Sequence, residues 1–186
     1  MTDSKLVEEL LAGREQVVDF FSGLDSVAVN TPATASEHPG GRPWSAKDHL
    51  AHLVQRESSF LPIARRVIDH EPYPTRLESR GDTPEERSIF VNRENQAVIE
   101  NRQHQTVAGL LEEFVALRSQ LVSMVEGLSS NDLVWNLAVT AERDAAVGIL
   151  LGSSDRHARA HLQTLRGVLI EASTESGRLG AQRRTP

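Results

Sequence analysis

The stretch VAGLLEEFVALRSQLVSMVEGL, residues 107–128, decides the fold class of this chain. Its large apolar side chains recur at steps of three and four residues: Leu110, Leu111, Phe114, Leu117, Leu121 and Met124. Side chains spaced in this way share one face of an α-helix, so the segment predicts an amphipathic helix with one buried stripe. Thr106 precedes the stripe as a natural N-cap, and Gly127 lies near its expected end.

The same period recurs along most of the chain. Residues 4–24, 45–70 and 140–172 each carry an apolar stripe at helical spacing, and a shorter segment at 83–101 follows the same rule. Connectors that contain Pro, Gly, Ser and Thr separate these segments, and we see no alternating strand pattern. The sequence therefore predicts an all-α fold, a four-helix bundle with one additional crossover helix.

Two helix starts carry specific signals. Ser45 and Asp48 have the spacing of a capping box at the start of the second long helix. Thr83 followed by Pro84 pairs an N-cap with a proline at the first helical position of the shorter helix. We expect a single domain over residues 1–174. Residues 175–186 lack a core-facing pattern and are expected to form a flexible tail.

Composition excludes several classes of function. The chain of 186 residues is 39% hydrophobic and 25% charged, as is typical of a globular domain. Its formal charge is −6 and it has no basic stripe, which argues against nucleic acid as a partner. The N-terminal residues lack the apolar core of a secretory signal, and no apolar run approaches the ~20 residues of a membrane span. We therefore expect a cytoplasmic protein with no membrane partner.

Cysteine is absent from the sequence. Disulfide bonds, thiolate metal ligands and a nucleophilic protein thiol are therefore excluded. Any thiol chemistry would have to use a thiol from a small molecule.

The stretch SSDRHARAHLQTL, residues 153–165, places His157 and His161 four residues apart on the expected buried face of the last helix. Two imidazoles at this spacing can converge on one metal ion, as in helical zinc sites. Chance produces such a pair in roughly one comparable sequence in five. A second interpretation is that both rings are core residues, each of which would need a polar partner away from water.

The second long helix offers a third ligand and a carboxylate. His49 and His52 both lie near its apolar face, and the helical projection does not choose between them. Glu57 projects into the middle of the same face, where a carboxylate usually meets a cation, a hydrogen-bond donor or a substrate. The alternative is a surface ion pair between Glu57 and one of the nearby arginines Arg56, Arg65 or Arg66.

Several motifs together resemble the DinB-like superfamily. They are WSAKDHLAHL at 44–53, FVNREN at 90–95, LSSNDL at 128–133 and the HxxxH pair of the last helix. This superfamily includes the bacillithiol- and mycothiol-dependent transferases and the N-terminal domain of maleylpyruvate isomerase. The resemblance spans nearly the whole chain, and it rests on the order and spacing of the motifs. It departs early in the last helix, where Ala145 and Val147 stand in place of a common aromatic residue, so we expect a differently shaped pocket.

The resemblance implies a four-helix bundle that holds a divalent metal on His52, His157 and His161, and it thereby selects His52 over His49. It also implies a homodimer and a role for Asn92 as a hydrogen-bond donor to substrate or water. A site of three imidazoles suits Zn²⁺ or Ni²⁺, with Fe²⁺ a further candidate, and leaves coordination positions open.

Three hypotheses for function follow. The first is an enzyme whose metal activates water or a low-molecular-weight thiol for hydrolysis, or for thiol transfer to a small electrophile, with Glu57 as general base or outer partner. The second is a non-catalytic DinB-like protein that binds a small molecule or acts in a stress response. The third is a structural bundle in which the histidines fill the core.

Overall fold

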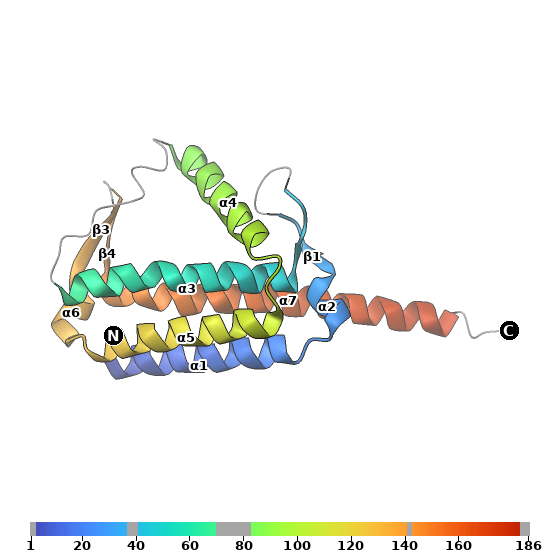
Figure 1. Cartoon of the computed structure of the whole chain (residues 1–186), viewed down its shortest axis with the longest axis horizontal. Helices are drawn as coiled ribbons and strands as arrows, with labels where there is room; N and C mark the ends of the chain where they lie inside the picture. The colour runs from blue at the N-terminus through green and yellow to red at the C-terminus, as the bar shows by residue number, and fades with distance from the viewer. Residues whose placement is uncertain (1–2, 37–40, 70–82, 141–142, 183–186) are drawn as a thin grey trace.

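A computed structural model gives the fold and describes residues 3–36, 41–69, 83–140 and 143–182 (Figure 1). The described chain is mostly helical, which confirms the predicted all-α class. Its helices are α1 (Asp3–Ser22), α2 (Ser26–Asn30), α3 (Ala46–Ile68), α4 (Pro84–Asn101), α5 (Val107–Glu126), α6 (Ser130–Val134) and α7 (Val147–Gln182). None of them combines the length and apolar character that crossing a membrane requires.

Helix starts follow the sequence signals. The Ser45 hydroxyl accepts a hydrogen bond from the Asp48 N–H, and the Asp48 carboxylate accepts one from the Ser45 N–H, which completes the predicted capping box of α3. Thr83 caps α4 in the same way, and Thr106 caps α5. These bonds satisfy backbone donors that the first helical turn leaves without partners.

Short strands occupy two connectors in which no strand was predicted. Strand β1 (Pro32–Thr34) pairs with β2 (Trp44–Ser45), and β3 (Asn136–Thr140) pairs with β4 (Arg143–Ala146), both antiparallel. Two to five residues are too few to show an alternating pattern against the helical background.

The bounds of the last helix differ from the prediction. It was expected to run from about Thr140 to Ala172, but β3 and β4 occupy its first residues, so α7 begins at Val147. The Val147 N–H donates to the Trp135 carbonyl at 2.9 Å, which ties the helix start to the base of the hairpin. At the other end α7 continues to Gln182, because no proline interrupts the backbone there. Flexibility of residues 175–186 stays a prediction, and 183–186 lie outside the described residues.

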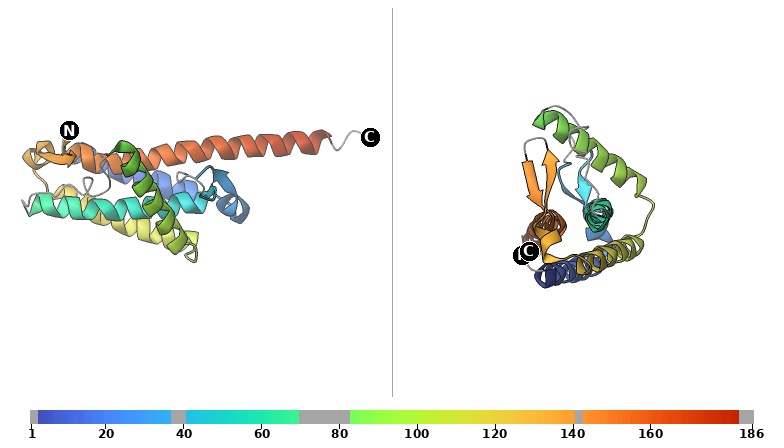
Figure 2. Two further views of the ribbon diagram at one scale, coloured as in Figure 1. Left: turned by 90° about the horizontal axis from the view of Figure 1, so that it is seen from above. Right: turned by 90° about the vertical axis from the view of Figure 1, so that its left-hand side faces the viewer.

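The long helices α1, α3, α5 and α7 pack side by side, and each contacts two of the others (Figures 1 and 2). Helix α1 lies between α5 and α7, and α3 lies between the same two on the opposite side. The shorter α4 crosses outside this body and packs against α3. Helix α7 extends beyond the other helices at its C-terminal end (Figure 1).

The interior contains two apolar clusters. One is made of Leu6, Leu10, Phe60, Ala64, Val67, Leu121, Val122, Val125, Leu128, Leu133, Leu137, Val147 and Leu151. The other is made of Val17, Phe21, Ala46, Leu50, Ala51, Leu53, Val54, Leu110, Phe114, Ala158, Leu162 and Leu165. Burial of these side chains is the main force that holds the helices together.

A buried polar layer separates the two clusters on every long helix. It consists of Gly13 on α1, Glu57 on α3, Arg118 on α5, and Ser154 with Asp155 on α7. On each helix the residues one turn before and after these positions belong to different clusters. Arg118 is 0% exposed and Glu57 is 1% exposed, so a charged pair lies at the centre of the molecule.

Gly13 allows α1 to approach this layer. A Cβ at Gly13 would overlap the Asp155 carboxylate and would lie 3.3 Å from Arg118 Nη1. We expect Gly13→Ala to lower the free energy of unfolding by about 1 to 3 kcal/mol, because the carboxylate must move within a packed interior. Urea denaturation measures the change.

Gly167→Ala is the matched control, since Gly167 also lies inside a helix but has open space around it. That substitution should stabilise the protein by about 0.5 to 1 kcal/mol through helix propensity alone. Equal effects of the two substitutions would contradict the tight contact between α1 and α7.

Candidate metal centre

Three histidine side chains converge between α3 and α7. Helix α3 contributes His52, and α7 contributes His157 and His161, one helical turn apart. The Nε2 atom of His157 lies 2.8 Å from Nε2 of His52 and 3.0 Å from Nε2 of His161. One ligand atom from each residue lies within 4.8 Å of the other two, so the group could hold a metal ion.

The geometry of these nitrogens suits an ion better than hydrogen bonds. A neutral imidazole has a single N–H, so the Nε2 atom of His157 cannot form a good hydrogen bond with both neighbours at once. Nitrogens about 2.1 Å from a common ion lie about 3.0 to 3.4 Å apart when they subtend right or tetrahedral angles. The observed separations are close to that range, and three protein ligands would leave further positions open.

Burial keeps all three rings neutral. Together with neighbouring positive groups, it lowers the pKa of His52 to about 2, that of His157 to about 3 and that of His161 to about 4. A neutral imidazole has the lone pair that a metal ligand needs, so the rings need not lose a proton near pH 7. His157 is half-buried and is the ligand most open to solvent, whereas His52 and His161 are buried.

The lowered pKa values predict that metal-free protein loses stability in mild acid. Below pH 6.5, the ordinary pKa of a histidine in the unfolded chain, the unfolded chain binds protons that the folded imidazoles do not bind. The free energy of unfolding therefore decreases as the pH decreases. Each such histidine should lower the free energy of unfolding by about 1.4 kcal/mol for every pH unit, until the pH reaches its pKa in the folded protein. Urea denaturation of chelator-treated protein between pH 7 and pH 5 measures the slope. This range lies above the titration of ordinary carboxyl groups.

The variant His157→Leu with His161→Leu tests the origin of that slope. It removes two of the three imidazoles whose pKa is lowered, so its stability should depend less steeply on pH. An unchanged slope would show that these rings are not the source.

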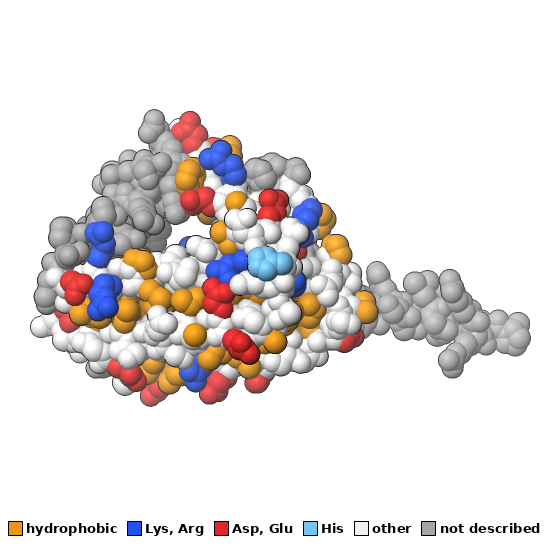
Figure 3. Space-filling view, in the orientation of Figure 1, with side chains coloured by type: hydrophobic (Ala, Val, Ile, Leu, Met, Phe, Trp, Pro, Cys, Tyr) orange, Lys and Arg blue, Asp and Glu red, His pale blue; other side chains and the backbone are white. Residues whose placement is uncertain are grey.

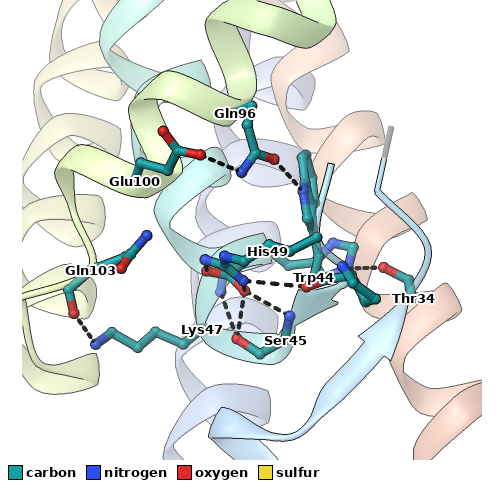
Figure 4. A network of polar contacts seen from close by, with 11 residues as sticks. Thr34, Trp44, Ser45, Lys47, His49, Gln96, Glu100 and Gln103 are labelled. Atoms are coloured by element: carbon teal, nitrogen blue, oxygen red, sulfur yellow. Dashed lines mark hydrogen bonds and ion pairs between the residues drawn. The ribbon is translucent and has the colours of Figure 1, made fainter. Parts of the chain in front are cut away.

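A fourth histidine lies directly behind one ligand. His49 Nδ1 is 2.7 Å from His161 Nδ1, and His49 Nε2 is 2.9 Å from the Thr34 hydroxyl, as Figure 4 shows for the Thr34 contact. When Nε2 of His161 binds an ion, its Nδ1 carries the proton and donates to His49. His49 then keeps a proton on Nε2, which it donates to Thr34. Strand β1 therefore fixes the orientation of a ligand on α7 through His49.

We expect His49→Ala to weaken metal affinity by about 10- to 100-fold, the usual cost of losing the outer partner of a ligand. The stoichiometry should remain one ion per chain, because the three converging nitrogens are untouched. Competition with a chromogenic chelator measures the affinity. Thr34→Val, which removes only the more distant hydroxyl, should have the smaller effect.

Trp44 closes the side of the centre next to α4. The indole is fully buried, with its ring 5.2 Å from the His49 ring and 5.5 Å from the His52 ring between centroids. Its Nε1–H donates to the side-chain oxygen of Gln96 on α4 at 3.4 Å (Figure 4). Gln96 in turn donates to Glu100, so the crossover helix reaches the centre through Gln96.

Glu57 is held in the polar layer. Arg118 Nε donates to Glu57 Oε2 at 2.7 Å, Arg118 Nη2 donates to Glu57 Oε1 at 2.6 Å, and Ser154 also donates to Oε1. The ion pair therefore joins α3 to α5 in the interior, and this partner differs from the surface arginines considered from the sequence. Ser154 lies one turn before His157 on α7, so the layer adjoins the metal centre.

Asn92, the other predicted site residue, lies half-buried on α4. The structure groups His52 with His157 and His161. The role of Asn92 stays a prediction. Sequence reasoning missed His49 as an outer partner and missed Gln96 and Arg118 altogether. Arg118 had a signal, because it lies four residues after Phe114 and three before Leu121 on the apolar stripe.

The chain matches no protein-family model, no curated protein and no solved structure. What the centre can do therefore follows from its own residues and geometry.

Proposed function

We propose that this protein is a metal-dependent enzyme of the DinB-like superfamily, a four-helix bundle that holds a divalent ion on His52, His157 and His161. The reaction is hydrolysis of a small electrophile, or transfer of a low-molecular-weight thiol to it. The convergence of the three Nε2 atoms carries the proposal. The order of the sequence motifs supports the superfamily, and the packing of α1, α3, α5 and α7 is compatible with it.

In this proposal the residues of the chain hold the metal ion, and the ion activates the nucleophile. Three neutral imidazoles hold the ion, and Zn²⁺ or Ni²⁺ suits them best, with Fe²⁺ a further candidate. A divalent ion with open positions lowers the pKa of water to about 7 or favours the deprotonated form of a thiol. Because the chain has no cysteine, the nucleophile has to come from solvent or from a small molecule.

The proposal also assigns roles to Glu57 and Asn92. We assign Glu57 the role of outer partner, because it accepts a hydrogen bond from Ser154 on the helix that carries two ligands. Action as a general base would require Glu57 to exchange its bonds with Arg118 for bonds to the nucleophile. Asn92 on α4 is assigned to hydrogen bonding with substrate or water.

One observation favours a second candidate, a DinB-like protein that binds a small molecule without turnover. Both oxygens of Glu57 are engaged by Arg118, so the predicted base is already occupied. A protein of this kind would keep the ion and the ligand site but would show no catalysis.

Elemental analysis of protein purified without a histidine tag tests the metal. Consumption of 1-chloro-2,4-dinitrobenzene, with a panel of small thiols or with water alone, then tests turnover. We expect one ion per chain and a metal-dependent rate that His161→Ala abolishes. A bound ion without any metal-dependent rate would favour the binding protein, and the absence of an ion from native and zinc-supplemented protein would contradict both.

The homodimer and the cytoplasmic location also belong to the proposal. Val134 is 61% exposed and Ile149 is 55% exposed, and both lie at the end of the molecule where α6 contacts α7. Sedimentation equilibrium measures the oligomeric state.

A further inference from the structure

One nitrogen of the candidate metal centre is buried without a hydrogen bond. The His52 side chain is 2% exposed, and its Nε2 atom faces Nε2 of His157 at 2.8 Å. Its other nitrogen, Nδ1, has no hydrogen-bond partner among the residues that the structure describes. His161 differs, because its Nδ1 atom lies 2.7 Å from His49. The two buried ligands are therefore held by different surroundings.

The indole of Trp44 packs against the His52 ring. The two ring centroids are 5.5 Å apart, the ring planes are tilted by 43°, and the indole is fully buried. The rings of His157 and His161 also contact His52, but their ligand nitrogens converge with its Nε2 atom. Trp44 approaches from β2 instead, and Gln96 on α4 accepts its Nε1–H (Figure 4). His52 thus has a metal-facing side and a side against the indole.

The position of one proton decides whether His52 is ready to bind an ion. A neutral imidazole carries its proton on either Nδ1 or Nε2. With the proton on Nε2, His52 would donate to His157 and close the centre with a hydrogen bond, and Nδ1 would bear a buried lone pair. With the proton on Nδ1, the lone pair of Nε2 is free for the ion. The face of an indole is the negative part of its charge distribution, so it attracts an N–H and repels a lone pair.

We propose that Trp44 is a positioning residue that keeps the proton of His52 on Nδ1, where the indole face receives it, and so leaves Nε2 ready for the metal ion. This inference rests on the proposed metal function and adds how the centre is prepared before the ion arrives. His49 does the same for His161 by accepting its Nδ1–H.

The third ligand needs no such partner. His157 is half-buried, and Figure 3 shows a hollow between α4 and the body of long helices, by which solvent reaches this side of α3. Solvent can therefore exchange the proton of His157 when an ion binds. The two buried ligands cannot rely on solvent, and each has a neighbour that fixes its proton in advance.

Full-length protein labelled with ¹⁵N and freed of metal by a chelator tests the proposal at pH 7. Two-bond ¹H–¹⁵N correlation spectra show which nitrogen of each histidine carries the proton, and the signals of His52 are identified by their absence from His52→Ala. We expect wild type to carry this proton on Nδ1. Trp44→Phe should keep it there because an aromatic face remains, whereas Trp44→Leu should move it to Nε2 in most molecules. The affinity for Zn²⁺ should fall by about two- to fivefold in Trp44→Leu, the range of a weak hydrogen bond to an aromatic face.

His161 is the internal control for the spectra. Its proton is set by His49 and should stay on Nδ1 in both variants of Trp44. A change at His161 as well as at His52 would mean that Trp44→Leu disturbs the whole centre, and it would overturn a specific role for the indole. Trp135→Leu, which replaces the other tryptophan of the chain, should change neither the protons nor the affinity.

Zinc-loaded wild-type protein gives a readout that needs no variant. Once Nε2 of His52 binds the ion, its proton has to lie on Nδ1, and the ring current of the indole should shift this ¹H resonance upfield of the hydrogen-bonded Nδ1–H of His161. The absence of that shift, or a proton on Nε2 of His52 in metal-free wild type, would overturn this inference alone. So would Trp44→Leu that leaves the proton on Nδ1. Failure to bind Zn²⁺ would instead overturn the metal function on which the inference rests.

Discussion

Arg118→Met is expected to lower the free energy of unfolding by about 3 to 5 kcal/mol. The guanidinium is fully buried and donates to both oxygens of Glu57, and it also donates to the Leu10 carbonyl at 2.9 Å and to Ser154 at 3.1 Å. Its loss leaves a buried carboxylate without its cation and a backbone carbonyl without its donor. Equilibrium unfolding in urea at pH 7, monitored by far-UV circular dichroism, measures the change.

The double variant Glu57→Met with Arg118→Met separates the cost of an orphaned charge from the net value of the pair. Apolar side chains of similar volume at both positions would join the two clusters across the layer. We therefore expect its stability to return to within about 2 kcal/mol of wild type, or to exceed it. A loss below about 1 kcal/mol in Arg118→Met alone is typical of an exposed pair and would contradict the burial of Arg118.

The same layer shows where sequence reasoning succeeds and where it stops. The apolar period of residues 107–128 predicts the helix and its buried face, because that period is a property of one segment. Which residue neutralises a buried charge depends on how two separate segments pack against each other. Glu57 projected correctly to the interior of its helix, but the partner that satisfies it lies 61 positions away on α5. Only the packing of α3 against α5 brings the two together.

The candidate metal centre also combines features that the sequence predicts with features that it does not. The spacing of His157 and His161 predicts a shared face, because both lie on one helix. The choice between His49 and His52 depends on the rotation of α3 relative to α7, which helical periodicity leaves open. The structure turns His52 towards His157, and it places His49 against the far nitrogen of His161. The contact with Thr34 depends on β1, a strand too short to predict.

His157→Ala should have the largest effect on metal binding, with the affinity for Zn²⁺ falling by more than about 100-fold. Loss of an outer partner costs about 10- to 100-fold, and loss of one of three ligands has to exceed this because two imidazoles remain to hold the ion. The Nε2 atom of His157 is also the one that both other ligands approach within 3.0 Å. Chelator competition and elemental analysis after dialysis measure the loss.

His104→Ala is the matched control, because His104 is exposed in the turn after α4 and lies outside the cluster. It should retain wild-type affinity. The pair His52→Ala and His49→Ala then identifies the ligand on α3, since the first removes a converging nitrogen and the second removes only an outer partner. A greater loss of affinity in His49→Ala than in His52→Ala would mean that α3 is rotated relative to its placement here and that the ion is held by a different set of rings.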